Sequence, residues 1–461
     1  MAERYDYDVT VLGGGPGGYV AAIKAAQSGK RTAIIEKESF GGTCLNVGCI
    51  PTKALVKTVG VFDEIRRSAE FGIEGIDTSA VRVSMEKLQK RKKAIVKQLV
   101  GGVNGLLKGN KVDIIKGTAA FEDAHTVCAG DRRITSEYFI IATGSQALMP
   151  GFIQYEGNTA IITSTEALDL DHIPERMNII GGGVIGIEFA YIFAHLGCKV
   201  TVLELMDQIL PMVDSDVSGL AKKALEKVGV IFQTGAKVKM VKDLSVIYEK
   251  DGQEQSVTAE LTLMAVGRVP YTQGLGAENI GIEFDRRAIK TGPDMRTNIP
   301  NIFAIGDVNG TSMLAHTASH EGLVAVANIL GESRQMSYDA VPACIYMEPE
   351  IASIGLTEQQ AREKYDHIKV GRFPMSANGK SLIEGEKSGM MKVILDGQYG
   401  EILGVHLFAV HATDMISEIS VAMSLEATAE EVIHAIHPHP TVSEAVSEAF
   451  MAAYDRAIHA L

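Results

Sequence analysis

The sequence predicts an α/β fold in which two similar strand–turn–helix–strand units precede a smaller α+β domain. Three observations lead to this prediction. The chain has 461 residues, enough for several domains of roughly 100–200 residues each. It contains 47 glycines but only 13 prolines, which is typical of tight strand-to-helix turns rather than of linkers. A glycine-rich segment near the N-terminus is also repeated in the middle of the chain.

The first copy of this repeat begins with an apolar strand over residues 9–12, which runs directly into three spaced glycines, Gly13, Gly15 and Gly18. A helix is predicted over residues 19–28. A second strand follows over residues 31–36 and ends at Glu36.

The second copy has the same order. A strand over residues 178–180 leads into Gly181, Gly183 and Gly186, and a helix is predicted over residues 187–196. The next strand, over residues 199–204, ends at Glu204. In both copies the glutamate lies 23 residues after the first glycine (13 to 36 and 181 to 204).

The pattern G-x-G-x-x-G at a strand–helix junction is typical of Rossmann-like units that bind dinucleotides. The first glycine makes the turn, the second lets a pyrophosphate approach the backbone, and the third lets the helix pack closely. The acidic residue accepts hydrogen bonds from a ribose. A single copy arises for structural reasons alone in many proteins, but two copies in the same register predict two bound dinucleotides. No Arg or Lys follows Glu204 in the next three residues, which favours NAD over NADP at the second unit because a carboxylate repels a 2′-phosphate.

Composition excludes several classes of function. The formal net charge of −13 argues against a nucleic-acid partner, because phosphate binding needs clustered Lys and Arg. No run of 18 apolar residues is present, so no membrane span is expected. Residues 1–8 carry acidic side chains where a signal peptide would be basic and then apolar, and a cytoplasmic location is expected.

The five cysteines do not form the even, regular pattern of a secreted disulfide framework. Cys128, Cys198 and Cys344 are isolated and are expected to be small buried residues. Cys44 and Cys49 lie five residues apart. An ideal helix rises about 7.5 Å over five residues, more than the roughly 6.8 Å that a disulfide spans between Cα atoms, so a bridge requires a break in the helix, for which Gly48 and Pro51 are suitable.

Pro51 also favours a helix that begins close to it, which would place Cys49 near a helix N-terminus, where a thiolate is stabilised. A redox-active bridge, two free thiols and a metal pair are the alternatives for Cys44 and Cys49. No metal site is expected, because no further Cys or His lies near enough in sequence to complete a zinc set.

The segment from Gly41 to Lys53 strongly resembles the active-site segment of the pyridine nucleotide–disulfide oxidoreductases. The resemblance continues through residues 140–144, 265–272, 297–307 and 437–444, and so covers essentially the whole chain. It implies that Cys44 and Cys49 form a redox disulfide, that the first unit binds FAD non-covalently, one per subunit, and that the second binds NAD.

The resemblance also implies the cofactor contacts. Asp307 is expected to hold the flavin's ribityl chain, and Lys53 to lie near the reactive edge of the ring, paired with Glu188. The expected FAD contacts are Gly13, Gly15, Gly18, Glu36, Lys53, Gly117, Ala119, Thr143, Gly144, Asp307, Met313, Leu314, Ala315 and His316. The expected NAD contacts are Gly181, Gly183, Gly186, Glu188, Glu204, Val238 and Gly267.

Two histidines near the C-terminus, His437 and His439, alternate with prolines. Proline on both sides of His439 indicates extended backbone, so the two side chains are expected to point the same way without converging on a metal. Glu444 follows five residues later and is expected to begin the last helix. The pattern resembles the family's His–Glu dyad, in which His439 is the general base and Glu444 orients it. In this family the base comes from the partner subunit, which implies a homodimer.

Within the family, the sequence best fits the members that oxidise protein-bound dihydrolipoamide to lipoamide and pass hydride to NAD⁺. Two alternatives are another FAD-dependent disulfide reductase, like those acting on glutathione disulfide or Hg²⁺, and a non-catalytic FAD-binding scaffold subunit. No cysteine follows Cys344, whereas mercuric reductases usually carry a C-terminal pair. The chain begins at its first strand without a lipoyl domain, so the lipoyl group is expected on another protein, from a 2-oxoacid dehydrogenase complex or the glycine cleavage system.

The expected domain order is an FAD-binding part over residues 1–147, an inserted NAD-binding domain over 148–272, a return to the FAD side over 273–341, and a dimerisation domain over 342–461. The chain is expected to cross between the two nucleotide units near residues 144–151 and 267–274.

Overall fold

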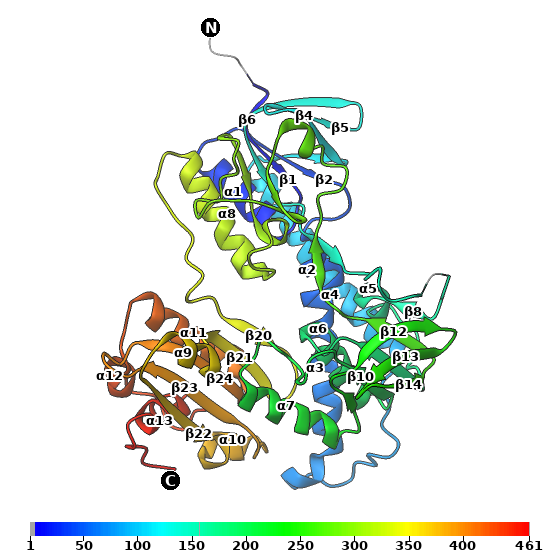
Figure 1. Cartoon of the computed structure of the whole chain (residues 1–461), viewed down its shortest axis with the longest axis vertical. Helices are drawn as coiled ribbons and strands as arrows, with labels where there is room; N and C mark the ends of the chain where they lie inside the picture. The colour runs from blue at the N-terminus through cyan, green and yellow to red at the C-terminus, as the bar shows by residue number, and fades with distance from the viewer. Residues whose placement is uncertain (1–4, 156, 461) are drawn as a thin grey trace.

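The first nucleotide-binding unit is built on a mostly parallel sheet whose two central neighbouring strands, residues 7–12 and 32–36, are largely buried. The computed structural model describes residues 5–155 and 157–460 (Figure 1); residues 1–4, on which part of the signal-peptide argument depends, lie outside the described part. The strand order is β3-β2-β1-β6-β5-β4, and β19 pairs with β6 on a separate branch. The strands are β1 (Tyr7–Leu12), β2 (Thr32–Glu36), β3 (Asp113–Lys116), β4 (Ala119–Asp123), β5 (Thr126–Ala129), β6 (Arg132–Ile141) and β19 (Ile302–Ala304).

Helices α1 (Pro16–Gln27) and α8 (Ala315–Ile329) lie side by side on this sheet (Figure 1). Glycine permits their close crossing. A Cβ on Gly17 would lie 2.9 Å from the carbonyl oxygen of Ala318, and one on Gly322 would lie 2.9 Å from that of Gly17. A side chain at either position would push the helices apart.

The second nucleotide-binding unit repeats the design with a parallel sheet in the order β11-β10-β9-β15-β8. A three-stranded antiparallel meander, β12-β13-β14, lies beside it. Helix α6 (Val184–His195) is buried along residues 186–194, because it packs on its own sheet and against α3. The remaining elements are β8 (Ile161–Ile162), α5 (Ser164–Ala167), β9 (Arg176–Ile180), β10 (Lys199–Leu203), α7 (Ser215–Lys227), β11 (Ile231–Gln233), β12 (Lys237–Lys242), β13 (Ser245–Lys250), β14 (Gln253–Thr258) and β15 (Leu261–Met264).

The two chain segments that connect these units lie next to each other. β7 (Ser145–Ala147) and β16 (Arg268–Pro270) pair as antiparallel strands. Both fall within the predicted crossings at residues 144–151 and 267–274. The second unit is therefore attached through a two-stranded joint. The segment after this joint contains η2 (Glu278–Ile280), β17 (Phe284–Asp285), β18 (Ala288–Ile289) and η3 (Gly306–Asn309).

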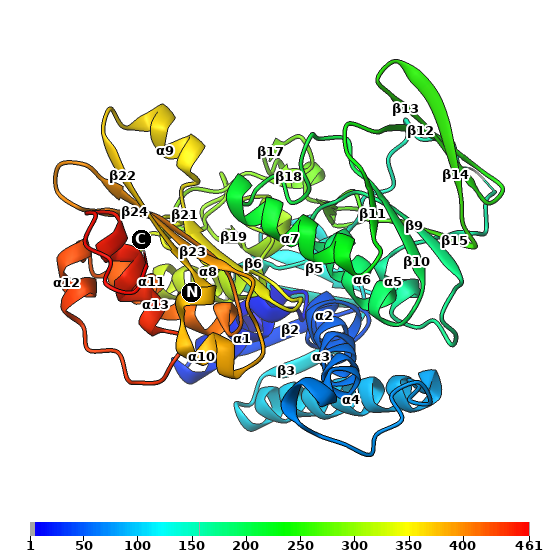
Figure 2. The ribbon, with the colours of Figure 1, turned by 90° about the horizontal axis from the view of Figure 1, so that it is seen from below.

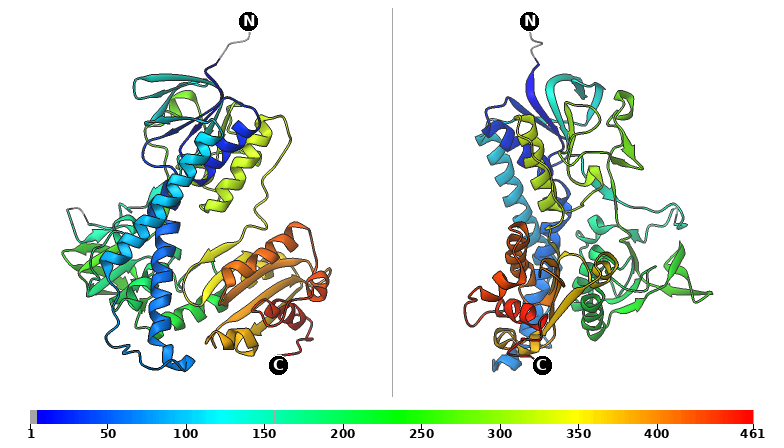
Figure 3. Two further views of the ribbon diagram at one scale, coloured as in Figure 1. Left: turned by 180° about the vertical axis from the view of Figure 1, so that it is seen from behind. Right: turned by 60° about the vertical axis from the view of Figure 1, so that its left-hand side comes forward.

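A pair of long helices extends from the first unit. Helix α2 (Gly42–Val47) is followed without a loop by α3 (Cys49–Arg66), then by η1 (Ser68–Phe71) and α4 (Met85–Gly109). α3 and α4 pack against each other along the molecule (Figure 3). None of the helices within residues 5–155 and 157–460 is long and apolar enough to cross a membrane.

The C-terminal unit is an α+β domain, as predicted. Its antiparallel sheet has the order β20-β21-β24-β23-β22, and all eight residues of β24 are buried because helices cover the sheet. The elements are β20 (Ala343–Ile345), β21 (Glu350–Gly355), α9 (Glu358–Lys364), β22 (Ile368–Pro374), η4 (Met375–Ala377), α10 (Gly379–Ile383), β23 (Met390–Asp396), β24 (Ile402–Ala409), α11 (Ala412–Ser424), α12 (Ala429–His434) and α13 (Glu444–Ala452).

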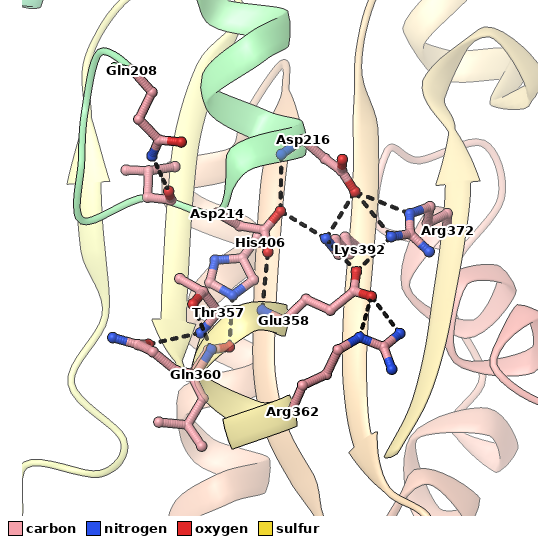
Figure 4. A network of polar contacts seen from close by, with 12 residues as sticks. Gln208, Asp214, Asp216, Thr357, Glu358, Gln360, Arg362, Arg372, Lys392 and His406 are labelled. Atoms are coloured by element: carbon pink, nitrogen blue, oxygen red, sulfur yellow. Dashed lines mark hydrogen bonds and ion pairs between the residues drawn. The ribbon is translucent and has the colours of Figure 1, made fainter. Parts of the chain in front are cut away.

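A buried ionic network fastens the second nucleotide-binding unit to this C-terminal sheet (Figure 4). The Lys392 side chain on β23 is 2% exposed, and its ammonium lies 2.8 Å from a carboxylate oxygen of each of Asp214, Asp216 and Glu358. Arg372 bridges Asp216 and Glu358 at 3.0 and 2.6 Å. Because Asp214 and Asp216 stand at the start of α7, the network crosses between the two units.

The Lys392→Met variant tests this network. Removing the ammonium leaves three partly buried carboxylates without their shared cation, and breaking a buried ionic contact typically costs about 3–5 kcal/mol. We expect a loss of this size in the free energy of unfolding, measured by urea denaturation. Arg362→Ala is the matched control, because Arg362 also pairs with Glu358 but its side chain is 60% exposed; the expected loss is below about 1 kcal/mol.

The same variant changes the acid sensitivity of the protein. Although burial opposes it, hydrogen bonds from Lys392 and Arg362 lower the pKa of Glu358 from 4.5 to about 2. A carboxylate whose pKa is lower in the folded state stabilises the fold above pH 4.5, and this contribution is lost as the pH falls towards 2. The stability difference between wild type and Lys392→Met should shrink across that window; a constant difference would contradict the assignment.

Candidate active site

The two glycine-rich turns have nearly the same geometry. The first glycines, Gly13 and Gly181, have φ angles of +109° and +106°, which side-chain-bearing residues rarely adopt. The third glycines leave no space for a side chain: a Cβ on Gly18 would lie 1.9 Å from the Gly13 carbonyl oxygen, and one on Gly186 would lie 2.0 Å from that of Gly181.

The second glycines face open space. No atom lies within 4 Å of a Cβ built on Gly15 or on Gly183. Each is the residue immediately before its helix, α1 or α6, where the first backbone N–H groups lack helical partners and the helix dipole favours an anion. The arrangement fits a pyrophosphate at each turn.

The two acidic residues also occupy matching positions. The Glu36 carboxylate accepts hydrogen bonds from the backbone N–H groups of Gly14 and Glu38, both at 2.7 Å. The Glu204 carboxylate accepts from Gly182 at 2.6 Å and from Met206 at 2.8 Å. These bonds fix each carboxylate beside its glycine turn and leave lone pairs free for a ribose.

A cavity next to Glu36 extends the first site along the sheet. It is lined by residues that include Gly13, Glu36, Gly117, Thr118, Ala119 and Thr143. Predicted FAD contacts from four separate segments thus share one cavity. Because its lining includes both the first glycine of the turn and the acidic residue, the cavity fits the adenosine half of a dinucleotide.

The cysteine pair lies at a break between two helices. α2 ends at Val47, Gly48 has non-helical angles (φ −143°, ψ −113°), and α3 starts at Cys49. A Cβ on Gly48 would lie 2.8 Å from the carbonyl oxygen of Thr43, so glycine is needed for this break. The predicted break and the position of Cys49 at a helix N-terminus are both confirmed.

Cys44 and Cys49 are not bonded to each other in this structure, and their environments differ. The hydrogen bond from Cys44, assisted by the Lys53 ammonium, lowers the pKa of Cys49 to about 7 despite its burial. The same hydrogen bond and burial raise the pKa of Cys44. Cys49 is therefore the more acidic thiol of the pair.

Lys53 lies one turn after Cys49 on α3 and pairs with Glu188, as predicted. Its ammonium is 2.9 Å from both carboxylate oxygens of Glu188, whose side chain is 5% exposed. Burial raises the pKa of Glu188 while Lys53 opposes that effect. The Tyr346 backbone N–H donates to the same carboxylate at 3.0 Å, and the Lys53 ammonium lies 4.5 Å from the centre of the Tyr346 ring. Sequence reasoning missed Tyr346.

Asp307 lies in the 3₁₀ turn η3, which follows β19. Its carboxylate accepts a hydrogen bond from the Ser145 hydroxyl, and the Arg268 Nε donates to that hydroxyl at 2.7 Å. Ser145 and Arg268 belong to the paired strands of the joint, and neither was predicted as a site residue. Their neighbours Gly144 and Gly267 were.

The segment predicted to lie along the flavin, Met313 to His316, leads into α8. Met313 and His316 are exposed, and Leu314 and Ala315 are half-buried. His316 contacts the carbonyl oxygen of Pro342 at 2.9 Å. At the second unit, the Val238 side chain packs in a buried cluster with Ile180 and Leu203, so only its backbone is available to a ligand.

His439 and Glu444 form a hydrogen-bonded pair, with 2.9 Å between the imidazole Nδ1 and a carboxylate oxygen. Glu444 is the first residue of α13, as predicted, and its other oxygen accepts from the Thr441 N–H at 2.9 Å, which lowers the pKa of Glu444. The His439 side chain is 81% exposed, so its Nε2 is available to a substrate.

The prediction that His437 and His439 point the same way is wrong. The His437 side chain is only 11% exposed and lies 3.6 Å from a carboxylate oxygen of Glu418 on α11. Glu418 raises the pKa of His437. The contact with Glu418 on α11 therefore outweighs the direction expected for His437 from the extended backbone between prolines.

The dyad and the cysteine pair do not meet within one chain. The α2–α3 junction and the start of α13 lie well apart in Figures 1 and 2. A cavity of about 340 Å³ opens beside the dyad, lined by residues that include His411, Glu418 and Thr441. No group of three or more His, Cys, Asp or Glu side chains able to hold a metal is present among residues 5–155 and 157–460.

The other cysteines follow the prediction only in part. Cys198 is buried, and burial raises its pKa to about 12. Cys128 is half-buried instead, and its thiol donates to a carboxylate oxygen of Glu122 at 2.7 Å. Cys344 is also half-buried, with burial raising its pKa to about 11.

The Cys49 thiolate can be tested with the variant Lys53→Met. In the reduced protein, alkylation of Cys49 by iodoacetamide, followed by peptide mass spectrometry, should increase with pH around an apparent pKa of about 7. Loss of the Lys53 ammonium should move that midpoint to higher pH. Lys57→Met is the control, because Lys57 is one turn further along α3 and exposed; equal midpoints in both variants would contradict the role of Lys53.

Two dinucleotide-binding turns beside a cysteine pair define a flavin- and nicotinamide-linked disulfide oxidoreductase. Comparison with known proteins agrees. Residues 7–322 match the family pyridine nucleotide-disulphide oxidoreductase, and residues 341–450 match the dimerisation domain of the same family. The chain belongs to the pyridine nucleotide-disulphide oxidoreductases, as the resemblance of its cysteine segment predicted, and membership implies FAD and NAD(H) as cofactors.

Similar proteins of known name align with nearly the full length of this chain. A dihydrolipoyl dehydrogenase of Bacillus subtilis (strain 168) is 43% identical and covers 98% of this chain and 99% of its own. A dihydrolipoyl dehydrogenase of Geobacillus stearothermophilus is 41% identical and covers 98% and 97%. Among solved structures, the HOCl-induced flavoprotein disulfide reductase RclA from Escherichia coli, in its Cu(II) complex, has a TM-score of 0.86 at 29% identity, covering 97% of this chain and 99% of that one.

Proposed function

We propose that this chain oxidises a dihydrolipoyl group to its cyclic disulfide and transfers the electrons through FAD to NAD⁺. The observation that carries the proposal is the asymmetry of the cysteine pair: Cys49 begins α3, one turn before Lys53, and has the lower pKa, whereas the pKa of Cys44 is raised. The relatives named dihydrolipoyl dehydrogenase, at about 40% identity over nearly the whole chain, support the choice of substrate.

The first unit would hold one FAD non-covalently. Its pyrophosphate would lie on the Gly13–Gly18 turn, its adenosine half beside Glu36 and Gly117, and its ribityl chain against Asp307. When bound, FAD supplies the chemistry that accepts an electron pair from the reduced cysteines and delivers hydride to NAD⁺. The second unit would hold NAD⁺ in the same way, with Glu204 beside the ribose. Leu205 and Met206 are 60% and 53% exposed next to it, and neither offers a cation to a 2′-phosphate.

The thiol chemistry follows from the positions of the protein's own groups. His439 removes a proton from a substrate thiol, and the resulting thiolate attacks Sγ of Cys44 in the oxidised pair. The Cys44–Cys49 bond breaks, and Cys49 leaves as a thiolate, which the helix N-terminus and Lys53 stabilise. The second substrate thiol then attacks the first substrate sulfur, closes the cyclic disulfide and releases Cys44. Cys44 takes the proton that His439 holds, and His439 in turn takes up the proton of the second substrate thiol, which it later passes to solvent. The substrate loses two electrons and the cysteine pair gains them.

A homodimer would bring the two halves of the site together. Within one chain, the dyad is exposed and apart from the cysteines. The C-terminal unit exposes large apolar side chains near the dyad, with Ile436 98%, Leu425 75% and Val421 59% exposed. These residues would form part of the subunit interface, so that His439 of one subunit serves the cysteines of the other.

The lipoyl group would arrive on a carrier protein of a 2-oxoacid dehydrogenase complex or of the glycine cleavage system. We also propose the division into residues 1–147, 148–272, 273–341 and 342–461. The separate sheets and the β7–β16 joint support this division. That the protein is cytoplasmic and binds neither nucleic acid nor a membrane stays a prediction from the sequence.

The dyad can be tested by His439→Gln and Glu444→Gln. Loss of a general base typically reduces the rate by about 10²–10⁴-fold, so kcat/KM for dihydrolipoamide should fall by about that factor in His439→Gln and by less in Glu444→Gln. His434→Gln is a suitable control, because His434 is an exposed histidine 3.6 Å from Glu430 on the same unit. Activity within threefold of wild type in His439→Gln would remove His439 from the mechanism.

The substrate can be tested by steady-state rates of the purified holoenzyme. We expect dihydrolipoamide with NAD⁺ to be the efficient pair, with little turnover of glutathione disulfide or Hg²⁺ and with NADP⁺ a poor substitute for NAD⁺. Reduction by dihydrolipoamide should also produce a long-wavelength thiolate-to-flavin absorbance band. A protein that turns over Hg²⁺ or glutathione disulfide but not lipoamide would refute the proposal, and one without the band would be a scaffold.

A further inference from the structure

Glu321 is a buried carboxylate that the proposed reaction does not use. It lies on α8 and is 0% exposed. Three donors reach it: one oxygen accepts from the Gly306 N–H at 2.5 Å and from the Asn309 side-chain amide at 3.0 Å, and the other accepts from the Tyr338 hydroxyl at 2.7 Å. The carboxylate is fully engaged although no cation pairs with it in the contacts described.

Two of these donors belong to the same short turn. Gly306 and Asn309 are the first and last residues of η3, and Asp307 lies between them. A single carboxylate oxygen therefore fastens both ends of the turn that presents Asp307. The third donor, Tyr338, lies in the segment between α8 and β20, which leads to the C-terminal unit.

The position is an unfavourable one for a charge. Burial raises the pKa of Glu321, and the nearby Asp307 charge raises it further. An apolar side chain of similar size would avoid both penalties, since buried ionic groups are often replaced by hydrophobic ones without loss of stability. Only a carboxylate can accept all of these hydrogen bonds from the turn, and an amide side chain could accept some of them.

We propose that Glu321 is a positioning residue for FAD, which fixes the Gly306–Asn309 turn so that the Asp307 carboxylate is held ready for the ribityl chain. The inference rests on the proposed role of Asp307. The Ser145 hydroxyl on β7 donates to the side chain of Asp307, so the backbone of the turn and the carboxylate that it presents are both held by hydrogen bonds. Because the turn is already ordered before FAD binds, less conformational entropy is lost on binding, and the affinity for FAD is higher.

The experiment measures FAD affinity directly, by removing FAD from the purified protein and following the quenching of FAD fluorescence on re-addition. Hydrogen bonds to a charged group are the strong ones, so Glu321→Leu should weaken FAD binding about tenfold or more. Glu321→Gln should recover part of the loss, because its amide oxygen can accept from Gly306. Asn309→Ala keeps the carboxylate and removes one bond to the turn, so it should weaken FAD binding by a smaller factor even if Glu321→Leu does not fold.

Glu448 provides the matched control. It is also a buried helical carboxylate, 6% exposed, and it accepts the backbone N–H groups of Ile458 and His459, but it lies on α13 in the C-terminal unit. Glu448→Leu should lower Tm and leave FAD affinity within about twofold. If Glu321→Leu behaves in the same way, Glu321 is merely structural and the inference fails.

A double-mutant cycle with Asp307→Asn separates this inference from the proposed function. If Glu321 acts through Asp307, Glu321→Leu should cost much less FAD affinity when Asp307 is already Asn. Equal effects in both backgrounds would overturn the inference while leaving the FAD site intact. If Asp307→Asn alone leaves FAD affinity unchanged, the assignment of Asp307 itself fails, and the inference with it.

Discussion

The Lys53–Glu188 ion pair is the contact on which the site most depends, because it joins all three parts of the molecule. Lys53 lies on α3, the helix that begins at Cys49, and Glu188 lies on α6, the helix of the second glycine turn. The Tyr346 N–H, which also donates to the Glu188 carboxylate, belongs to the C-terminal unit. A buried carboxylate is strongly disfavoured unless a cation or hydrogen-bond donors compensate it, and here Lys53 and the Tyr346 N–H do so. The three parts are therefore constrained to meet at this point, which is also where the Cys49 thiolate needs a positive charge.

The same pair links the redox chemistry to the second nucleotide. Glu188 lies on α6 two residues after Gly186, and α6 begins at the turn that would hold the NAD⁺ pyrophosphate. Any shift of that helix moves the counter-ion of Lys53, and hence the charge next to Cys49. The cysteine pair and the second glycine turn are thus connected through one helix, α6, rather than through a loop.

The features predictable from the sequence were those encoded within short stretches. The glycine turns, the acids 23 residues later, the break at Gly48 and the pairing of His439 with Glu444 all depend on neighbours within about two dozen positions, and the structure shows each of them. The family resemblance added the Lys53–Glu188 contact, across 135 positions. What could not be predicted depends on distant partners with no local pattern: the backbone of Tyr346, the three carboxylates around Lys392, and Glu418, which turns His437 inward.

The β7–β16 joint has a consequence for how such a chain can be assembled. Because the second unit leaves and re-enters the first through two adjacent antiparallel strands, its ends lie close together. An insertion with neighbouring ends interrupts its host at a single spot and leaves the host's sheet intact. The strands of the first sheet therefore stay continuous although a whole second unit, with a matching glycine turn, is inserted between them.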